Sequence, residues 1–208
     1  REMILVDDGS EEETKSFLEG KSSEFKLLRN EQSKGFAFSN NFGVSQASGD
    51  WLLFLNNDLL LKRGWGTPFD EVVDGSKKLA RLGCLGNLQL DPRSGKIDHA
   101  GVTFRNGIPE HFLQGEKTFP STDYSEFLAV TGACFMIRRE LFLEVGGFDE
   151  SFGLFFGDVD LARRLEQLGR GDGPWPLDYG RAKHAILPGA PAPQDTEQHD
   201  GESDRRPE

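Results

Sequence analysis

The feature that most constrains this fold is an unbroken apolar run, residues 51–55, which stops abruptly at the polar triplet 56–58. Such a short run is typical of a strand that is covered on both faces in the centre of a parallel sheet. The same pattern occurs earlier, where residues 3–6 lead into the acidic turn 7–10. Both runs therefore predict strands whose carboxyl ends bring polar side chains to one edge of an open α/β sheet, where ligands bind.

Helix signals separate these two strands. Ser10 precedes three consecutive glutamates, which predicts a helix that is capped by Ser10 and ends at about Gly20, with residues 17–18 on its apolar face. A second strand is predicted over residues 25–28, and a second helix over residues 37–47. The order strand, helix, strand, helix, strand predicts a parallel α/β sheet.

The rest of the folded part shows weaker signals. Residues 84–104 mix short strands with turns, and residues 129–137 form another apolar stretch. Residues 138–145 carry the apolar face of a helix that ends at a double-glycine turn, and residues 158–168 predict an amphipathic helix.

The composition changes after residue 187. Residues 188–208 contain proline, glycine and charged side chains but no aromatic residue. Such a segment cannot bury enough apolar surface to fold, so we expect a disordered acidic tail over residues 188–208. The remaining residues, 1–187, are expected to form one domain.

Charge and cysteine content exclude several classes of protein. With 24 basic and 35 acidic side chains the net charge is −11, the wrong sign for general nucleic-acid binding. Two cysteines, Cys84 and Cys134, are too few for a disulfide framework, and we expect both in the core. No apolar run approaches the roughly 18 residues that a spanning helix needs, and no basic-then-apolar leader opens the chain. We therefore expect neither a membrane-spanning nor a secreted chain.

Three acidic clusters are candidates for chemistry, and each has a plain structural alternative. The acidic turn 7–10 can accept hydrogen bonds from a nucleobase or ribose, or it is an ordinary turn with a cap. Asp58 suits a hard divalent cation, or it belongs to a simple strand-to-helix loop. Asp158 follows a phenylalanine-rich loop whose apolar wall would raise its basicity, as suits a general base, or it is a plain helix cap.

The histidines add fewer constraints. His184 follows a polar stretch and could bind a metal through its imidazole. His99 and His111 flank a glycine-containing segment. Each of the three, taken alone, is typical of a structural or surface histidine.

Seven short motifs follow one another between residue 3 and about residue 184: Val6-Asp7-Asp8-Gly9-Ser10, Lys34-Gly35-Phe36-Ala37 with Asn40-Asn41, Leu55-Asn56-Asn57-Asp58, Gly64-Trp65, Thr131-Gly132-Ala133-Cys134, Gly146-Gly147-Phe148-Asp149-Glu150 and Asp158-Val159-Asp160-Leu161. Their set and order resemble the family 2 glycosyltransferases, and more narrowly the bacterial rhamnosyltransferase-like branch.

The resemblance implies a GT-A fold, which is a Rossmann-like, mostly parallel α/β sheet flanked by helices. It also implies a nucleotide-diphospho-sugar donor, a divalent cation (Mg²⁺ or Mn²⁺), a glycan or lipid-linked glycan acceptor, and inversion at the anomeric carbon. By position, the implied donor-binding residues are Asp7, Asp8, Gly9, Gly35, Asn41 and Asn57, the implied metal ligands are Asp58 and His184, and the implied general base is Asp158.

The chain also departs from the family pattern. The first strand and helix of the family are absent from the sequence, so we expect an N-terminally truncated version of the fold. Gly157 stands where relatives carry glutamate, and residues 169–181 lack the aliphatic strand expected before His184.

These departures keep two functions open. The first is an inverting transferase for polysaccharide or glycolipid glycans, with a deoxysugar such as rhamnose as one candidate donor, working in the cytoplasm or at the inner face of the membrane. The second is an inactive remnant that binds a nucleotide-sugar or a partner protein. A nucleotidyltransferase would need a Gly/Lys-rich phosphate loop near residue 1, and none is present.

Overall fold

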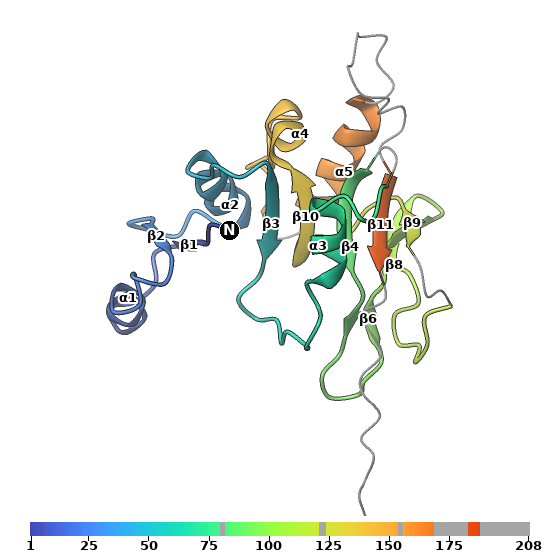
Figure 1. Ribbon diagram of the computed structural model, residues 1–208, viewed down its shortest axis with the longest axis horizontal. Coiled ribbons are helices and arrows are strands. Elements are labelled where there is room, and N and C mark those ends of the chain that lie inside the picture. Colours follow the sequence, from blue (N-terminus) through green and yellow to red (C-terminus); the bar gives the residue numbers. More distant parts are fainter. Residues whose placement is uncertain (80–81, 121–123, 154–155, 169–182, 188–208) are drawn as a thin grey trace, which may run out of the picture.

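The computed structural model describes residues 1–79, 82–120, 124–153 and 156–168, together with the backbone of residues 183–187. Its central element is a sheet in the order β3-β10-β4-β11-β9 (Figure 1). These strands are β3 (Trp51–Leu55), β10 (Cys134–Arg138), β4 (Leu82–Asn87), β11 (Lys183–Leu187) and β9 (Ser125–Phe127). A separate parallel pair is formed by β1 (Ile4–Asp7) and β2 (Lys26–Arg29).

The expected mostly parallel sheet is wrong for the central sheet. Strand β10 is antiparallel to both β3 and β4, β9 is antiparallel to β11, and only β4 and β11 pair in parallel. The reason is that β10 starts where β3 ends, and the Asn56 N–H donates to the Ala133 carbonyl at 2.8 Å. Residues 131–133 therefore lie at the same edge as the polar residues that follow β3.

The expectation that residues 51–55 form a central, doubly covered strand is also wrong. Strand β3 lies at the edge of the five-stranded sheet, with Leu52 and Phe54 buried and Leu53 and Leu55 each 43% exposed. Within the described residues, β3 pairs only with β10 and β1 pairs only with β2. The two sheets are thus not hydrogen-bonded to each other, and α2 (Phe36–Ser45) lies beside β1 (Figure 1).

Helices cover both faces of the central sheet. Helices α2, α4 (Arg139–Glu144) and α5 (Gly157–Leu168) supply one face of the core, and α3 (Thr67–Val73) packs on the other through Phe69. The helices expected over residues 11–20, 37–47, 138–145 and 158–168 are all confirmed within a few residues. This α/β/α layering confirms the α/β fold class.

The first helix, α1 (Glu12–Glu19), differs from expectation in two ways. Its N-cap is Glu11, not Ser10, because the Ser10 N–H donates to Asp7 Oδ1 at 2.9 Å and holds Ser10 in the preceding turn. Its apolar residues are not buried, and Phe17 is 64% exposed. This helix therefore contributes no buried residue to the core.

A phenylalanine cluster forms the centre of the core. The Phe54 and Phe135 rings stack at 4.7 Å between centroids, joining β3 to β10. Phe142 and Phe148 meet Phe54 at 5.2 and 5.4 Å, which ties α4 and the following turn to the same sheet. Such aromatic pairs add roughly 0.5–1.5 kcal/mol each beyond the area that they bury.

Neither cysteine forms a disulfide and both are buried, which confirms that they are core residues. Burial raises the pKa of Cys134 to about 12 and raises that of Cys84 as well. Both thiols therefore stay protonated at neutral pH and are poor nucleophiles.

The middle of the chain forms two short hairpins. They are β5 (Gln89–Leu90) with β6 (Ile97–His99), and β7 (Val102–Arg105) with β8 (Ile108–His111). The second hairpin turns at Asn106 and Gly107, which have φ values of 53° and 82°. Two positive φ values of this kind are typical of a type I′ hairpin turn. The short strands and turns expected over residues 84–104 are confirmed.

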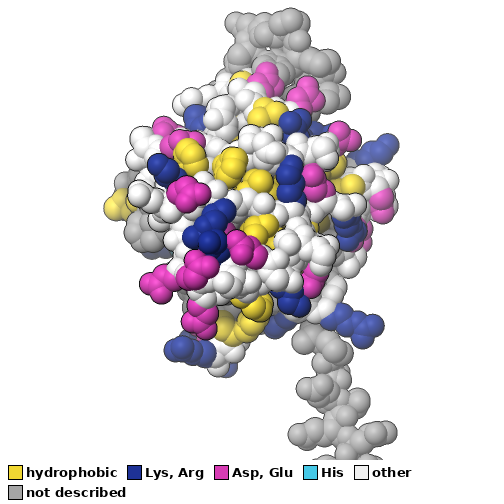
Figure 2. All heavy atoms as spheres, turned by 90° about the vertical axis from the view of Figure 1, so that its left-hand side faces the viewer, with side chains coloured by type: hydrophobic (Ala, Val, Ile, Leu, Met, Phe, Trp, Pro, Cys, Tyr) yellow, Lys and Arg dark blue, Asp and Glu magenta, His cyan; other side chains and the backbone are white. Residues whose placement is uncertain are grey.

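The surface carries charges of both signs. On the side where β1, β2 and α1 lie, acidic and basic side chains alternate with scattered apolar ones (Figure 2). No single-sign basic field covers this face, in agreement with the net charge of −11. None of the helices in the described part of the chain is long and apolar enough to span a membrane.

Candidate active site

A cleft of about 420 Å³ opens where β3 ends, β10 and α5 begin, and the β7–β8 hairpin folds over. Its lining comes from residues distant in sequence: Phe36, Ala37, Asn56, Val102, Pro109, Glu110, His111, Thr131, Gly132, Ala133, Phe152, Gly153, Phe156, Gly157, Asp158 and Val159. The antiparallel entry of β10 is what brings residues 131–133 to this edge. The cleft is mainly apolar with a few convergent polar groups, as is usual for small-molecule sites.

Asp158 lies in the first turn of α5 and is the one candidate catalytic residue that lines this cleft. Its Oδ2 accepts the Gly132 N–H at 2.8 Å, and its Oδ1 accepts the Val159 N–H at 2.8 Å. The start of a helix favours a carboxylate there. A carboxylate offers about four acceptor positions, so the described partners leave about half of them for a ligand. Asp158 is thus oriented but not saturated.

Backbone strain occurs directly beside Asp158. Phe156 has φ of 68°, in the left-handed region that a bulky residue rarely adopts, and its side chain is 56% exposed in the cleft wall. Strained residues of this kind cluster at functional sites. Of the expected phenylalanine-rich wall, Phe152 and Phe156 do line the cleft, and Phe155 lies outside the described residues.

Asp8 has a different environment. Five groups donate to its carboxylate at 2.7–2.9 Å: the Asn30 amide, the Ser33 and Ser39 hydroxyls, and the Lys34 and Gly35 N–H groups. Burial acts to raise the Asp8 pKa, but these hydrogen bonds outweigh it and hold the pKa well below its usual range. The carboxylate is saturated by its own protein, so Asp8 organises the loop before α2 and has no acceptor position left for a base.

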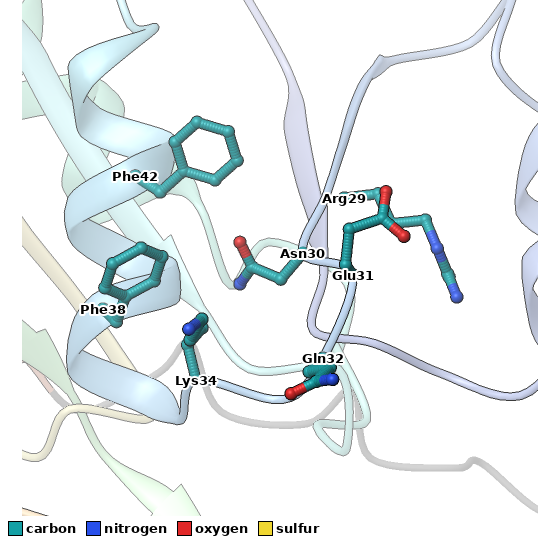
Figure 3. A pocket seen from close by; sticks show the side chains of 7 residues that line it. All are labelled: Arg29, Asn30, Glu31, Gln32, Lys34, Phe38 and Phe42. Carbon is teal, nitrogen blue, oxygen red and sulfur yellow. The ribbon is translucent and has the colours of Figure 1, made fainter.

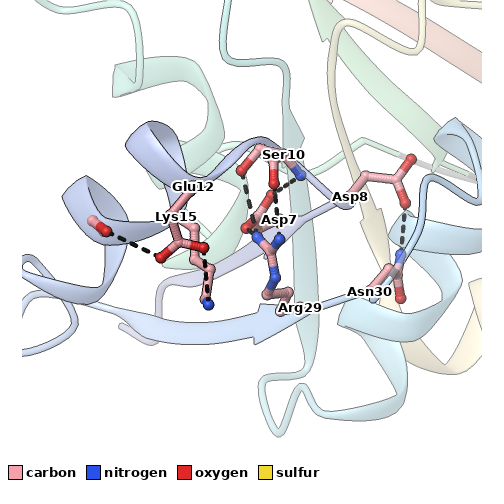
Figure 4. A network of polar contacts seen from close by, with 8 residues as sticks. Asp7, Asp8, Ser10, Glu12, Lys15, Arg29 and Asn30 are labelled. Carbon is pink, nitrogen blue, oxygen red and sulfur yellow. Dashed lines mark hydrogen bonds and ion pairs between the residues drawn. The ribbon is translucent and has the colours of Figure 1, made fainter.

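Asp7 stabilises the adjoining turn. It is 5% exposed, accepts the Ser10 N–H at 2.9 Å and pairs with the Arg29 guanidinium, which also donates to the Ser10 carbonyl at 2.8 Å (Figure 4). Burial raises its pKa, and the Ser10 and Arg29 contacts lower it further than burial raises it. Asp7 therefore joins the end of β1 to the end of β2.

Gly9 allows the turn after β1 to approach the loop after β2 closely. Its φ is 77°, and a Cβ built on it would lie 2.6 Å from the Ser33 nitrogen. Gly35 also has a positive φ, 87°, at the N-cap of α2, but a Cβ there would meet nothing within 4 Å. Gly9 is therefore required for close approach, and Gly35 for its backbone conformation.

Replacing Gly9 by alanine is expected to lower the free energy of unfolding by about 2–3 kcal/mol, because the backbone must leave the left-handed region or the Ser33 loop must move. Urea denaturation monitored by fluorescence measures this. Gly75→Ala is the matched control, since Gly75 has φ of 79° with open space around it. Equal losses in both variants would show that φ alone, and not the close approach, sets the cost.

The other residues carried over from the resemblance lie outside the cleft lining. The Asn41 amide exchanges hydrogen bonds with the Phe148 backbone at 2.9 and 3.0 Å, and so ties α2 to the turn after α4. Asn57 and Asp58 are exposed in the loop after β3, next to Asn56, which does line the cleft. His184 lies in β11, opposite Phe127, and its side chain is not among those described.

The chemistry of Asp58 fits a divalent cation. Its carboxylate is exposed, and no described residue holds it by a hydrogen bond or ion pair. Mg²⁺ and Mn²⁺ favour carboxylate oxygens and complete their shells with phosphates and water. In the described part of the chain, no three His, Cys, Asp or Glu side chains gather into a metal cluster. Asp58 is thus a fitting single protein ligand for a cation that a diphosphate also binds.

A shallower pocket of about 290 Å³ lies between α2 and the loop after β2. It is lined by Arg29, Asn30, Glu31, Gln32, Lys34, Phe38 and Phe42 (Figure 3). Phe38 and Phe42 project from α2 towards Asn30 and Lys34, and the Lys34 ammonium lies 5.9 Å from the Phe38 ring centre. None of the residues carried over from the resemblance lines this pocket.

Sequence reasoning missed three groups that the fold brings to the cleft. Asn56 was grouped with its neighbours, but it alone of that triplet lines the cleft. The motif containing Thr131 and Gly132 received no role, although the Gly132 N–H holds the Asp158 carboxylate. His111 lines the cleft because of how the β7–β8 hairpin packs, which the sequence around a single histidine does not indicate.

Comparisons with known proteins show the family of this chain. The family profile described as Glycosyl transferase family 2 matches residues 1–146. The O-antigen biosynthesis protein RfbC of Myxococcus xanthus is 37% identical over 139 residues, covering 62% of this chain and 10% of RfbC. The N-acetylglucosaminyl-diphospho-decaprenol L-rhamnosyltransferase of Mycobacterium tuberculosis (strain ATCC 25618 / H37Rv) is 26% identical over 196 residues, covering 80% of this chain and 61% of the enzyme. The chain thus spans only part of each relative.

Solved structures share the fold. The structure of GalNAc-T7 with UDP, GalNAc and Mn²⁺ matches with a TM-score of 0.62 at 17% identity, covering 89% of this chain and 36% of that one. Residues 1–349 of TarS from S. aureus match with a TM-score of 0.55 at 17% identity, covering 89% and 48%. At this identity the likeness shows a GT-A-like α/β fold.

Proposed function

The chain belongs to glycosyl transferase family 2, and we propose that it transfers a sugar from a nucleotide-diphospho-sugar to a hydroxyl of a glycan or lipid-linked glycan, with inversion. The observation that carries this proposal is the Asp158 carboxylate, which lines the cleft, is oriented by the Gly132 and Val159 N–H groups and keeps acceptor capacity. Fold alone does not decide chemistry, so the proposal rests on this site.

Asp158 acts as the general base in the proposed reaction. The acceptor oxygen forms a bond to the anomeric carbon while the bond from that carbon to the diphosphate breaks, and the diphosphate leaves with the electron pair. Asp158 takes the proton of the attacking hydroxyl on its unoccupied acceptor positions. The Gly132 N–H keeps the carboxylate aimed into the cleft. A single displacement inverts the anomeric centre.

Asp58, with His184 as a second candidate, would hold the divalent cation. When bound, such a cation stabilises the negative charge of the leaving diphosphate. The support is the unengaged Asp58 carboxylate, which follows Asn56 of the cleft by two residues. GalNAc-T7, with the same fold, was crystallised with UDP and Mn²⁺.

The names of two relatives support finer features of this proposal. The names of RfbC and of the mycobacterial rhamnosyltransferase support synthesis of a surface polysaccharide, a deoxyhexose donor and a diphospholipid-linked acceptor. We also propose that the reaction takes place in the cytoplasm or at the inner face of the membrane. We further propose that residues 1–187 form the domain and that residues 188–208 form a tail. The tail lies outside the described residues.

Among UDP, GDP and dTDP, one nucleotide is expected to bind in calorimetric titrations with Mn²⁺, and Asp58→Ala is expected to weaken that binding at least tenfold because a charged cation ligand is lost. Asp50→Ala, an exposed acid just before β3, is the matched control. Binding of no nucleotide by folded protein, or equal binding by Asp58→Ala, would contradict the proposed donor site.

The alternative, a remnant without turnover, has a specific observation in its favour. Asp8, the residue implied to contact the donor base, is saturated by five internal hydrogen bonds. Gly157 also supplies no carboxylate at the position next to Asp158 in the chain. Nucleotide binding without transfer to any acceptor would favour this second function.

A further inference from the structure

Two histidines that have no role in the proposed mechanism form a direct pair beside the cleft. His99 ends β6, and His111 ends β8. Their Nδ1 atoms lie 2.7 Å apart, and the two rings meet edge to face at 80°. His99 is 2% exposed, whereas His111 is exposed and lines the same cleft as Asp158. A hydrogen bond between two Nδ1 atoms requires that only one of them carry a proton.

The backbone around His99 decides which nitrogen carries that proton. His99 Nε2 accepts the Gly101 N–H at 3.2 Å and the Thr131 N–H at 3.1 Å. An atom that accepts two N–H groups cannot itself carry hydrogen. Burial first, and the neighbouring His111 second, lower the His99 pKa to about 3, so the ring is neutral at neutral pH. The single proton of His99 is therefore on Nδ1.

The position of the His99 proton determines the tautomer of His111. His99 Nδ1–H donates to His111 Nδ1, which must then offer its lone pair. A neutral His111 consequently carries its proton on Nε2, the far side of the ring from His99. The other tautomer of His111, with its proton on Nδ1, would place the Nδ1–H groups of His99 and His111 against each other. It would be tolerated only if His99 moved its own proton to Nε2, against the Gly101 and Thr131 N–H groups.

We propose that His99 locks His111 as an Nε2–H hydrogen-bond donor of the substrate cleft, and that this N–H binds an oxygen of the nucleotide-sugar or of the acceptor saccharide. The inference rests on the proposed function and deepens it by adding a binding residue. Glu110, the adjacent acid in the lining, pairs with the Arg105 guanidinium at 2.9 Å. His111 is therefore the hydrogen-bond donor of these two neighbouring side chains. A metal ligand at His111 Nε2 is disfavoured, because that atom holds the proton.

The pair also links to the general base through the backbone. Thr131, whose N–H is held by His99, precedes Gly132, whose N–H holds the Asp158 carboxylate. His99 is thus a positioning residue for both sides of the cleft, and His111 is the side chain that contacts substrate.

Long-range ¹H–¹⁵N spectra of the full chain test the tautomers directly. At pH 7.0 to 7.5 we expect His99 protonated on Nδ1 alone and His111 on Nε2 alone, with the resonances assigned by His111→Gln and His99→Asn. A proton on His111 Nδ1, or a His99 ring that is charged at this pH, would overturn the proposal whatever the chain catalyses.

Kinetics and titrations test the substrate bond. His111→Ala is expected to raise the KM of one substrate about 5- to 10-fold with a smaller effect on kcat, as loss of one hydrogen bond predicts. His111→Gln, whose amide N–H takes the place of Nε2–H, is expected to restore most of that loss. Nucleotides and saccharides, added separately, distinguish the two oxygen sources by which one shifts the His111 Nε2 resonance.

The two failures are distinguishable. If wild-type protein binds nucleotide and transfers sugar but His111→Ala matches it in both KM values, the inference is wrong and the proposed function stands. If wild-type protein binds neither nucleotide nor saccharide, the proposed function fails and the substrate role of His111 fails with it, while the spectra still report the tautomers.

Discussion

Replacing Asp158 by asparagine is expected to lower kcat for sugar transfer by about 10²- to 10⁴-fold, the usual contribution of a general base. The amide keeps an oxygen for the Gly132 N–H but cannot take a proton from the acceptor hydroxyl. Nucleotide affinity is expected to change by less than about threefold, since the loss concerns a group that acts in the transition state. Steady-state kinetics combined with calorimetry separates the two quantities.

Asp160→Asn is the matched control for Asp158→Asn. Asp160 lies in the same first turn of α5, but its carboxylate pairs with Arg164 at 2.7 Å and does not line the cleft. We expect its kcat to stay near that of the wild type. A similar loss in both variants would point to a general effect of charge at the start of α5 and would argue against Asp158 as the base.

Replacing Asp8 by alanine is expected to lower the free energy of unfolding by about 4 kcal/mol, because five donors lose one acceptor. Two of them, Asn30 and Ser39, are buried and cannot turn to water without opening the loop. Asp91→Ala is the control, since Asp91 accepts backbone N–H groups in an exposed turn. We expect it to cost less than about 1 kcal/mol.

Asp8→Ala should also change how the free energy of unfolding depends on pH in the acid range. The Asp8 pKa is lowered in the folded chain from an unfolded value near 3.8, so ionised Asp8 stabilises the fold above pH 3.8 and loses this effect as the pH falls towards its folded pKa. Wild-type stability should therefore drop more steeply than that of Asp8→Ala between about pH 5 and pH 2. Denaturant unfolding at four pH values measures this. An equal fall in the free energy of unfolding of both proteins over this pH range would contradict it.

Local patterns predicted most elements, and non-local pairing accounts for the errors. The helix over 158–168 follows from its own periodicity and stop signal, and the helix over 37–47 follows from its Ala, Ser and Asn content and the stop at Ser48-Gly49. The structure confirms both. The direction of β10 depends instead on where the chain re-enters the sheet, which its apolar residues do not encode. The same holds for β3, whose five apolar residues fit a central strand equally well as an edge strand.

The candidate site was predictable only in part, for a similar reason. The phenylalanine-containing loop before a helix predicted Asp158 as a site residue, and Asp158 does line the cleft. The acids that follow strands, Asp8 and Asp58, do not line it. Which carboxylates can still accept a hydrogen bond from a ligand depends on their partners in the fold. Donors of its own loop occupy the acceptor positions of Asp8, whereas Asp158 keeps acceptor positions for a ligand. The His99–His111 pair depends on how two hairpins pack, so single-residue reasoning could not find it.

The most direct test of the account is the fate of the sugar. Nucleotide-sugars are incubated with the chain and Mn²⁺, with water or a saccharide as acceptor, and the first-formed anomer is followed by ¹H NMR. Inverting transfer with Asp158 as the base predicts an anomeric configuration opposite to that of the donor for wild-type protein and for Asp160→Asn, and almost no product for Asp158→Asn. Retention of configuration, or equal product from Asp158→Asn, would contradict it.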